Sequence, residues 1–329
     1  MDSPVLTPDS AYTPAQVAAY LTHIGLPPSF HPSANPTLNL TYLTTLFTHQ
    51  ITTIPYDNLS IHYSPTHSIN LNPQALFTKM ITANRGRGGY CMENSILFNH
   101  MLRALGFSDA YLAGVRIRPR VAGVPQGEAY TGWVHLVNIV SVPGEAAKYV
   151  LDVGFGGDGM TRPMPLVEGV VQHNGIGTQE VRFGRRFIPN QRFRGEGAER
   201  MWVYEVRNGV EREWVPFFAF HDRFEFTEAD FGNINWYTSQ AKESHQTWTT
   251  LAIRFLRGVA EDGTAKVVGK VMMAEGVIKE NLTGKTRLVK VCKTEEERVA
   301  TLAELFGIHL TPEEAASIKG RPAELLGEV

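Results

Sequence analysis

The spacing of apolar residues changes near residue 109 of this 329-residue chain, and the change limits the folds available to it. Before that point, apolar residues recur at helical spacing. After it, short runs rich in β-branched and aromatic residues are broken by glycine and proline, which is typical of strands. Helix and strand signals mix again from about residue 220. We therefore expect an α+β fold in three parts, at residues 1–108, 109–219 and 220–329.

The first part carries start and stop signals for a bundle of helices. Thr13 begins a capping box and Gly25 marks a stop, which predicts one helix between them. Others are expected at residues 38–47 and after Asn72. A fourth is expected at residues 91–105, where Gly106 would end it.

Strand signals dominate the second part and return in the third. In the second part they are spaced as in a small barrel or a sandwich, in the runs YLAGVRIR, WVHLVNIV, KYVLDVGF, EVRFGRRF, MWVYEV and EWVPFF. The third part predicts an α/β lobe. Its helix is expected at TEADFGNINWYT, its strands at WTTLAIRFL and AKVVGKVMM, its hairpin at VIKENLTGKTRLVKV, and further helices after Thr294 and Thr311.

Composition argues against several classes of function. The formal net charge of −2 gives no electrostatic reason to expect nucleic acid or membrane partners. No apolar run approaches the roughly 20 residues that span a bilayer, and the first residues lack the regions of a signal peptide. Two cysteines cannot form a disulfide framework, so we expect a reducing, cytoplasmic location and a small-molecule substrate. No metal site is expected, because the histidines are scattered and neither cysteine has a C-x-x-C partner.

One cysteine stands where a reactive thiol would be expected. In RGRGGYCMENS, Cys91 follows a glycine-rich turn and begins a helical pattern. The first turn of a helix favours negative charge, and therefore the thiolate, which is the nucleophile. A lone cysteine is also commonly a small buried apolar residue, which is the interpretation we give to Cys292.

A cysteine nucleophile needs a base, and the base needs an orienting group. His135 lies within the apolar run WVHLVNIV, and Asp152 precedes a glycine turn in VLDVGFGG. The separation of 17 residues (152 − 135) suits two adjacent antiparallel strands. A buried carboxylate requires a partner, and His135 is the candidate. The alternatives are a hydrogen-bonded core histidine and an aspartate that caps its own turn.

Together these motifs resemble the arylamine N-acetyltransferase family. RGGYCMEN, TGWVHL and VLDVGFGG are similar to its cysteine, histidine and aspartate motifs, in the same order. IPYDNLSIHY, FGNINWYTSQ and LAELFGIHL extend the resemblance over almost the whole chain. The resemblance implies a helical bundle, a central β-barrel and a C-terminal α/β lid, with a cysteine-protease-like Cys-His-Asp arrangement.

The resemblance also implies a ping-pong reaction. Cys91 would accept the acyl group from acetyl-CoA as co-substrate, His135 would be its base and ion-pair partner, and Asp152 would orient the imidazole. An arylamine or hydrazine would then attack the thioester.

Binding and supporting roles follow from the same resemblance. Contacts with CoA are implied for three residues: Thr131, Gly132 and Tyr237. Arg87 and Asp57 would form a buried ion pair under the cysteine turn. Tyr56 would line the substrate site, where the family usually has Phe.

Several alternatives stay open. Longer relatives include enzymes that prefer malonyl-CoA, and propionyl-CoA is a further candidate donor. The sequence leaves open whether Arg116, Arg118 or Arg120 would face the extra carboxylate of a malonyl group. A papain-like or transglutaminase-like amidohydrolase shares the order Cys, His, Asp, and a non-catalytic binding protein is the third possibility. The oligomeric state is also open.

Overall fold

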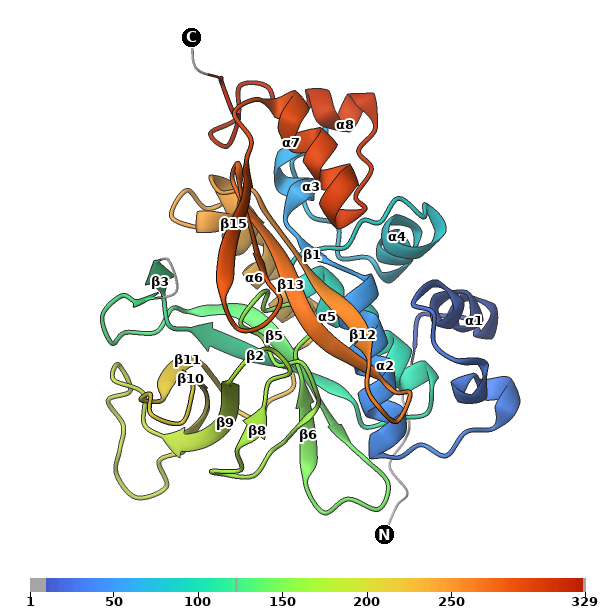
Figure 1. Cartoon of the computed structure of the whole chain (residues 1–329). Helices are drawn as coiled ribbons and strands as arrows, with labels where there is room; N and C mark the ends of the chain where they lie inside the picture. The colour runs from blue at the N-terminus through green and yellow to red at the C-terminus, as the bar shows by residue number, and fades with distance from the viewer. Residues whose placement is uncertain (1–9, 122–123, 328–329) are drawn as a thin grey trace.

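A computed structural model describes residues 10–121 and 124–327. Figure 1 shows the N-terminal helices in blue and teal on one side of the molecule and a curled sheet in green and yellow below them. A second sheet, in orange and red, lies across the middle of the view. The chain has the α+β architecture expected from its sequence.

The first part contains helices, and several of them begin just after a capping residue. They are α1 (Pro14–His23), α2 (Leu40–Thr53), α3 (Leu59–His62), α4 (Pro73–Phe77) and α5 (Cys91–Ala104). Thr13 forms the capping box of α1, and Asn39 accepts a hydrogen bond from the backbone of Tyr42 at the start of α2. The α2 helix continues past its expected end at residue 47. The extension carries buried polar residues such as Gln50, whose side-chain oxygen accepts from the Tyr20 hydroxyl at 2.7 Å.

The second part forms one antiparallel sheet of eight strands in the order β7-β6-β5-β2-β11-β10-β9-β8. The strands are β2 (Tyr111–Ile117), β5 (Trp133–Ser141), β6 (Lys148–Leu151), β7 (Met164–Pro165), β8 (Gln172–His173), β9 (Gln179–Arg186), β10 (Met201–Asn208) and β11 (Val215–Phe220). The sheet curls as a barrel wall does, which decides between the barrel and the sandwich (Figure 1). A small separate pair, β3 (Arg120–Val121) and β4 (Val124–Pro125), lies beside it.

The third part forms a five-stranded sheet in the order β1-β12-β13-β14-β15. Its strands β12 (Leu251–Val259), β13 (Ala265–Ala274), β14 (Val277–Asn281) and β15 (Thr286–Val291) accompany helices α6 (Glu228–Gln240), α7 (Glu295–Thr301) and α8 (Pro312–Ala316). The edge strand β1 (Tyr56–Asp57) comes from the helical part and pairs with β12. The helical part therefore supplies a strand to the C-terminal sheet, a long-range pairing that the sequence pattern did not predict.

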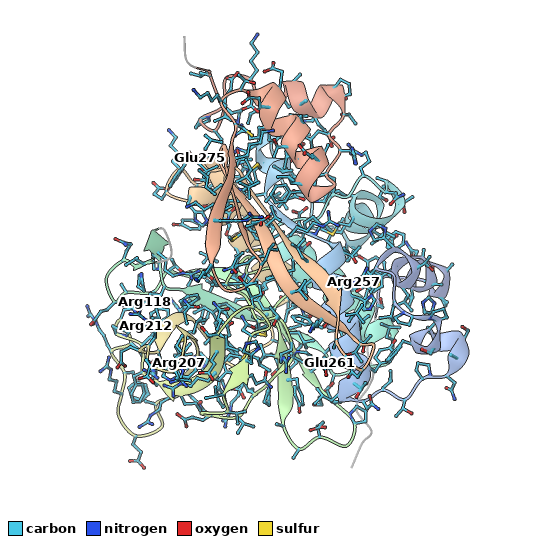
Figure 2. All side chains as sticks on the ribbon, viewed as in Figure 1. Arg118, Arg207, Arg212, Arg257, Glu261 and Glu275 are labelled. Atoms are coloured by element: carbon cyan, nitrogen blue, oxygen red, sulfur yellow. The ribbon has the colours of Figure 1, made fainter. Side chains whose placement is uncertain are left out.

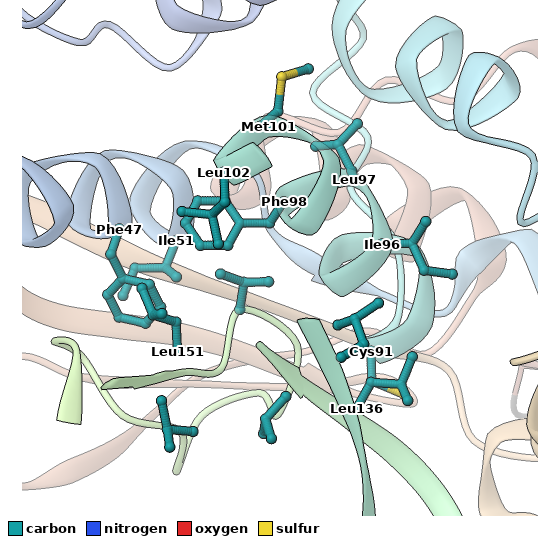
Figure 3. Packing of buried hydrophobic residues seen from close by; sticks show 14 of the residues in the cluster. Phe47, Ile51, Cys91, Ile96, Leu97, Phe98, Met101, Leu102, Leu136 and Leu151 are labelled. Atoms are coloured by element: carbon teal, nitrogen blue, oxygen red, sulfur yellow. The ribbon is translucent and has the colours of Figure 1, made fainter. Parts of the chain in front are cut away.

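The main core lies where α5 packs against β5. In Figure 3, Cys91 lies at the foot of α5 near Leu136, and Phe98 on the same helix points toward Phe47 and Leu151. The rings of Phe47 and Phe98 meet edge to face with centroids 6.3 Å apart. Among the described residues, no helix has the length and apolar character needed to cross a bilayer.

Truncation of this core is expected to destabilise the protein strongly. Phe98 is 0% exposed, so Phe98→Ala should lower the free energy of unfolding by about 3–5 kcal/mol through lost burial and a cavity. Phe193 is 65% exposed, and Phe193→Ala should change it by no more than about 0.5 kcal/mol. Denaturant unfolding of both variants tests this, and equal losses would contradict the core assignment.

Candidate active site

Close backbone packing fixes the turn that precedes Cys91. A Cβ on Gly88 would overlap the carbonyl oxygen of Pro55, and one on Gly89 would lie 2.6 Å from the Cβ of Glu93. The backbone of Gly89 also pairs with that of Tyr56 in β1. Only glycine allows this approach, so the glycines of the RGRGGYC motif place Cys91 as the first residue of α5.

A buried carboxylate, that of Asp57, accepts hydrogen bonds from the backbone of the same turn. Asp57 is 0% exposed and accepts hydrogen bonds from the backbone N–H of Gly88 at 2.8 Å and of Leu59 at 3.1 Å. Its ion pair with Arg87 measures 3.3 Å. Burial would raise the pKa of Asp57, but Arg87, Lys79 and the backbone donors outweigh it and hold the pKa below its usual value. The structure thus brings together Arg87 and Asp57.

Two further charged groups beside the turn were not recognised in the sequence. Glu314, from the C-terminal helix α8, accepts from Arg87 at 3.3 Å and also pairs with Arg85. Glu93, in the first turn of α5, is paired with Lys79 at 2.5 Å and accepts from the backbone of Tyr90. Glu93 follows Cys91 by two positions and could have been noticed as a first-turn acid. Glu314 could not have been noticed in the same way, because it lies far from this turn in the sequence.

His135 and Asp152 form a buried pair on adjacent strands. Nε2 of His135 lies 2.8 Å from Oδ2 of Asp152, and the two residues are 1% and 3% exposed. The other carboxylate oxygen, Oδ1, accepts from the backbone N–H of Gly154 at 3.0 Å. Asp152 lies just past the end of β6, where it is fixed at both oxygens.

Cys91 lies against this pair. Its sulfur is 3.7 Å from the carbonyl oxygen of Val134, the residue before His135, and its residue is 5% exposed. Burial would lower the pKa of His135, but the Asp152 carboxylate and then the Cys91 sulfur outweigh burial and raise it to about 10. At neutral pH, His135 is therefore an imidazolium that can pair with a thiolate.

Backbone and aromatic rings pack against Cys91, His135 and Asp152. A Cβ on Gly154 would lie 2.6 Å from the Cα of Cys91, so the glycine after Asp152 allows the two motifs to touch. The ring of Phe155 meets His135 edge to face at 5.5 Å, and Phe218 lies 6.1 Å from the same imidazole. These rings keep water from the pair. Phe155 was present in the VLDVGFGG motif but was given no role there.

Tyr56 is buried beneath the cysteine turn. Its hydroxyl accepts a hydrogen bond of 2.8 Å from Nε2 of Gln246, in the short 3-10 helix η4 (His245–Thr247). Burial raises the pKa of this phenol, and the neighbouring Cys91 adds to the shift. The hydroxyl that distinguishes Tyr56 from Phe is therefore engaged within the protein.

The three residues with an implied CoA role lie on different elements. Thr131 precedes β5, and its hydroxyl accepts from the backbone of Ile117 at 2.9 Å. A Cβ on Gly132 would face open space, and Tyr237 is 44% exposed on α6. Within the described ranges, no hydrogen bond or ring contact joins Tyr237 to the other two.

Comparison with known proteins agrees with these motifs. Residues 39–315 match the family model described as N-acetyltransferase. An N-malonyltransferase from Fusarium pseudograminearum is 31% identical over 323 residues, which cover 92% of this chain and 91% of the relative. An arylamine N-acetyltransferase from Mycolicibacterium smegmatis is 28% identical over 314 residues, which cover 94% of this chain and 98% of the relative.

Solved structures of arylamine N-acetyltransferases share the fold. The Mycobacterium marinum protein in complex with CoA matches 94% of this chain and 99% of its own, with a TM-score of 0.71 and 23% identity. The Mycobacterium abscessus protein matches 97% and 100%, with a TM-score of 0.73 and 21% identity. The fold class inferred from the sequence is confirmed, and the family match shows that this chain is an acyltransferase of the arylamine N-acetyltransferase family.

Proposed function

We propose that this protein moves an acyl group from acyl-CoA to an arylamine or hydrazine through a thioester on Cys91. The observation that carries the proposal is the buried pair of His135 and Asp152, 2.8 Å apart, beside a cysteine at the start of a helix. A thiolate that is paired with an imidazolium is nucleophilic at neutral pH. Family membership supports the same chemistry.

The first half-reaction is acylation of Cys91. The thiolate attacks the thioester carbonyl carbon of acyl-CoA, a bond forms between that carbon and Sγ, and the bond to the CoA sulfur breaks. The His135 imidazolium gives its proton to the departing CoA thiolate. Asp152 holds the ring in orientation through Nε2 during the transfer.

The second half-reaction returns the enzyme to its starting state. Arylamines and hydrazines are mostly unprotonated at neutral pH, so they attack the thioester carbonyl directly. As the tetrahedral intermediate collapses, neutral His135 accepts the proton of the amine and the bond to Sγ breaks. The amide leaves, and the thiolate and imidazolium pair again.

Two acyl donors are candidates. The family resemblance puts acetyl-CoA first, whereas 31% identity to an N-malonyltransferase over 92% of the chain favours malonyl-CoA. In either case the CoA moiety is proposed to contact three residues: Thr131, Gly132 and Tyr237. A solved relative in complex with CoA supports a CoA thioester as the co-substrate.

The thioester is directly testable by intact-protein mass. Exposure to acetyl-CoA or malonyl-CoA without amine should add one acyl group to the native protein and none to Cys91→Ala, because Cys91 is the nucleophile. Cys292→Ala is the matched control, since it removes the only other cysteine and should leave labelling intact. The label should disappear when an arylamine is added. Failure of both donors to label, or turnover to free acid at the same rate without amine, would contradict acyl transfer and favour the hydrolase.

The charge state of His135 gives a second test. Since its folded-state pKa of about 10 lies above the ordinary 6.5, its stabilising contribution is complete below about pH 6.5 and lost as pH rises through about 10. Asp152→Asn removes the attracting carboxylate and should lower the pKa of His135 by about 1–3 units. Nitrogen NMR of the imidazole across this range measures both values. Asp262→Asn, in an exposed turn, should leave the titration unchanged; an identical midpoint in Asp152→Asn would contradict the pairing.

A further inference from the structure

We propose that Arg120, together with Lys270, binds the terminal carboxylate of a malonyl-type acyl group while that group is on Cys91. The inference rests on the proposed acyl transfer and adds to it the residue that selects the acyl group. Three observations support it: the position of Arg120, the charges around it, and the hydrogen bonds and stacking that already engage the neighbouring arginines.

Arg120 lies over the aromatic rings that enclose the catalytic histidine. Its guanidinium carbon is 3.7 Å from the ring centroid of Phe217 and 5.2 Å from that of Phe155. Phe155 in turn contacts His135, with ring centroids 5.5 Å apart. The guanidinium is thus one aromatic ring away from the imidazole, and stacking on two rings holds it flat.

The charged side chains next to Arg120 give the cluster a net positive charge. Nη1 of Arg120 is 3.0 Å from Asp158, and Nζ of Lys270 is 3.5 Å from the same carboxylate. Lys270 is buried, with 7% of its side chain exposed, and it also donates to the carbonyl of Gly157. Two cations therefore share one anion. Within the described part of the chain, the other guanidinium N–H groups of Arg120 have no hydrogen-bond partner.

The same loop links these charges to the nucleophile. Residues 154–158 begin where Gly154 packs on the Cα of Cys91 and end at Asp158. A Cβ on Gly157 would lie 3.5 Å from Nζ of Lys270, so the absence of a side chain there leaves the lysine facing the loop backbone. Cys91 and the positive cluster thus lie at opposite ends of one five-residue loop.

The two other candidate arginines are engaged elsewhere. Arg116 stacks on Trp133, with its guanidinium carbon 4.2 Å from the ring centroid, and donates to the carbonyl of Thr131. Arg118 donates twice to the carbonyl of Gly127 at 3.0 and 2.8 Å, and Figure 2 labels it on the left of the view, beside the barrel sheet. Within the described ranges, neither guanidinium stacks on Phe155 or Phe217 as that of Arg120 does. The structure therefore selects Arg120 from the three.

The chemistry of the acyl group explains why such a residue discriminates. A malonyl group carries a carboxylate where an acetyl group carries only a hydrogen of its methyl. A guanidinium with free N–H groups in a partly buried site would make charge-assisted hydrogen bonds to that carboxylate. An acetyl group leaves those donors unused and gains nothing from them.

A competition experiment tests the assignment. The full chain is exposed briefly to equimolar acetyl-CoA and malonyl-CoA without amine, and the two Cys91 adducts are resolved by intact mass, since they differ by CO₂. Native protein should carry mainly the malonyl adduct. In Arg120→Met the ratio of malonyl to acetyl adduct should fall about 10- to 100-fold, which corresponds to the loss of charged hydrogen bonds. Because both adducts form on the same folded molecules, a partly unfolded variant does not distort the ratio.

Matched variants make the outcome specific. Arg118→Met removes an arginine of the same segment whose guanidinium is bonded to the carbonyl of Gly127, and it should keep the native ratio. Arg120→Lys keeps the charge and should retain part of the preference. An unchanged ratio in Arg120→Met, or a native preference for acetyl, would overturn the inference while leaving acyl transfer standing. Absence of any Cys91 adduct from either donor would instead overturn the proposed function.

Discussion

The buried carboxylate of Asp57 is the interaction on which the site depends, because it ties together segments from the beginning and the end of the chain. It belongs to β1, which is the edge strand of the C-terminal sheet through its pairing with β12. It accepts from the turn before Cys91 and pairs with Arg87, which also contacts Glu314 of α8. An unpaired carboxylate at 0% exposure would be strongly destabilising, so these partners must be in place when the protein folds. Placement of the nucleophile is therefore coupled to docking of the C-terminal part.

Strand register places Asp152 beside His135. Asn138 of β5 faces Leu151 of β6, and continuing that register puts Asp152 beside Val137, two positions from His135 on the same face. The barrel thus supplies the base and its orienting group, while the helical part supplies the thiol. The two meet where Gly154 touches the Cα of Cys91. A shift of one residue in β5 would turn His135 to the opposite face of the sheet, and a shift in β6 would do the same to Asp152, so the pairing depends on the register as well as on the residues.

Features with a local cause could be predicted from the sequence. The cap of α1 follows from Thr13, and the approach of Cys91, His135 and Asp152 followed from motifs that each contain their own structural context. Long-range features could not be predicted. The pairing of Glu314 with Arg87 spans 227 residues, and no local pattern marks either partner for the other. The same holds for the hydrogen bond between Gln246 and Tyr56 and for the direction of Arg120, which is decided by the positions of two phenylalanine rings.

The proposed selectivity for an acyl group rests on the charge balance around Cys91. Asp57 and Glu314 balance Arg85 and Arg87, and Glu93 balances Lys79. The carboxylate of Asp152 pairs with the imidazolium of His135, which leaves the immediate surroundings of Cys91 without excess positive charge. A carboxylate brought in by an acyl group would therefore find no compensation there. In the described structure, the cluster of Arg120, Lys270 and Asp158 supplies that compensation from the far end of the 154–158 loop, where one anion is shared by two cations. This distribution of charge is the physical basis of the proposed preference for an acyl group that is neutral at its reactive carbonyl and anionic at its end.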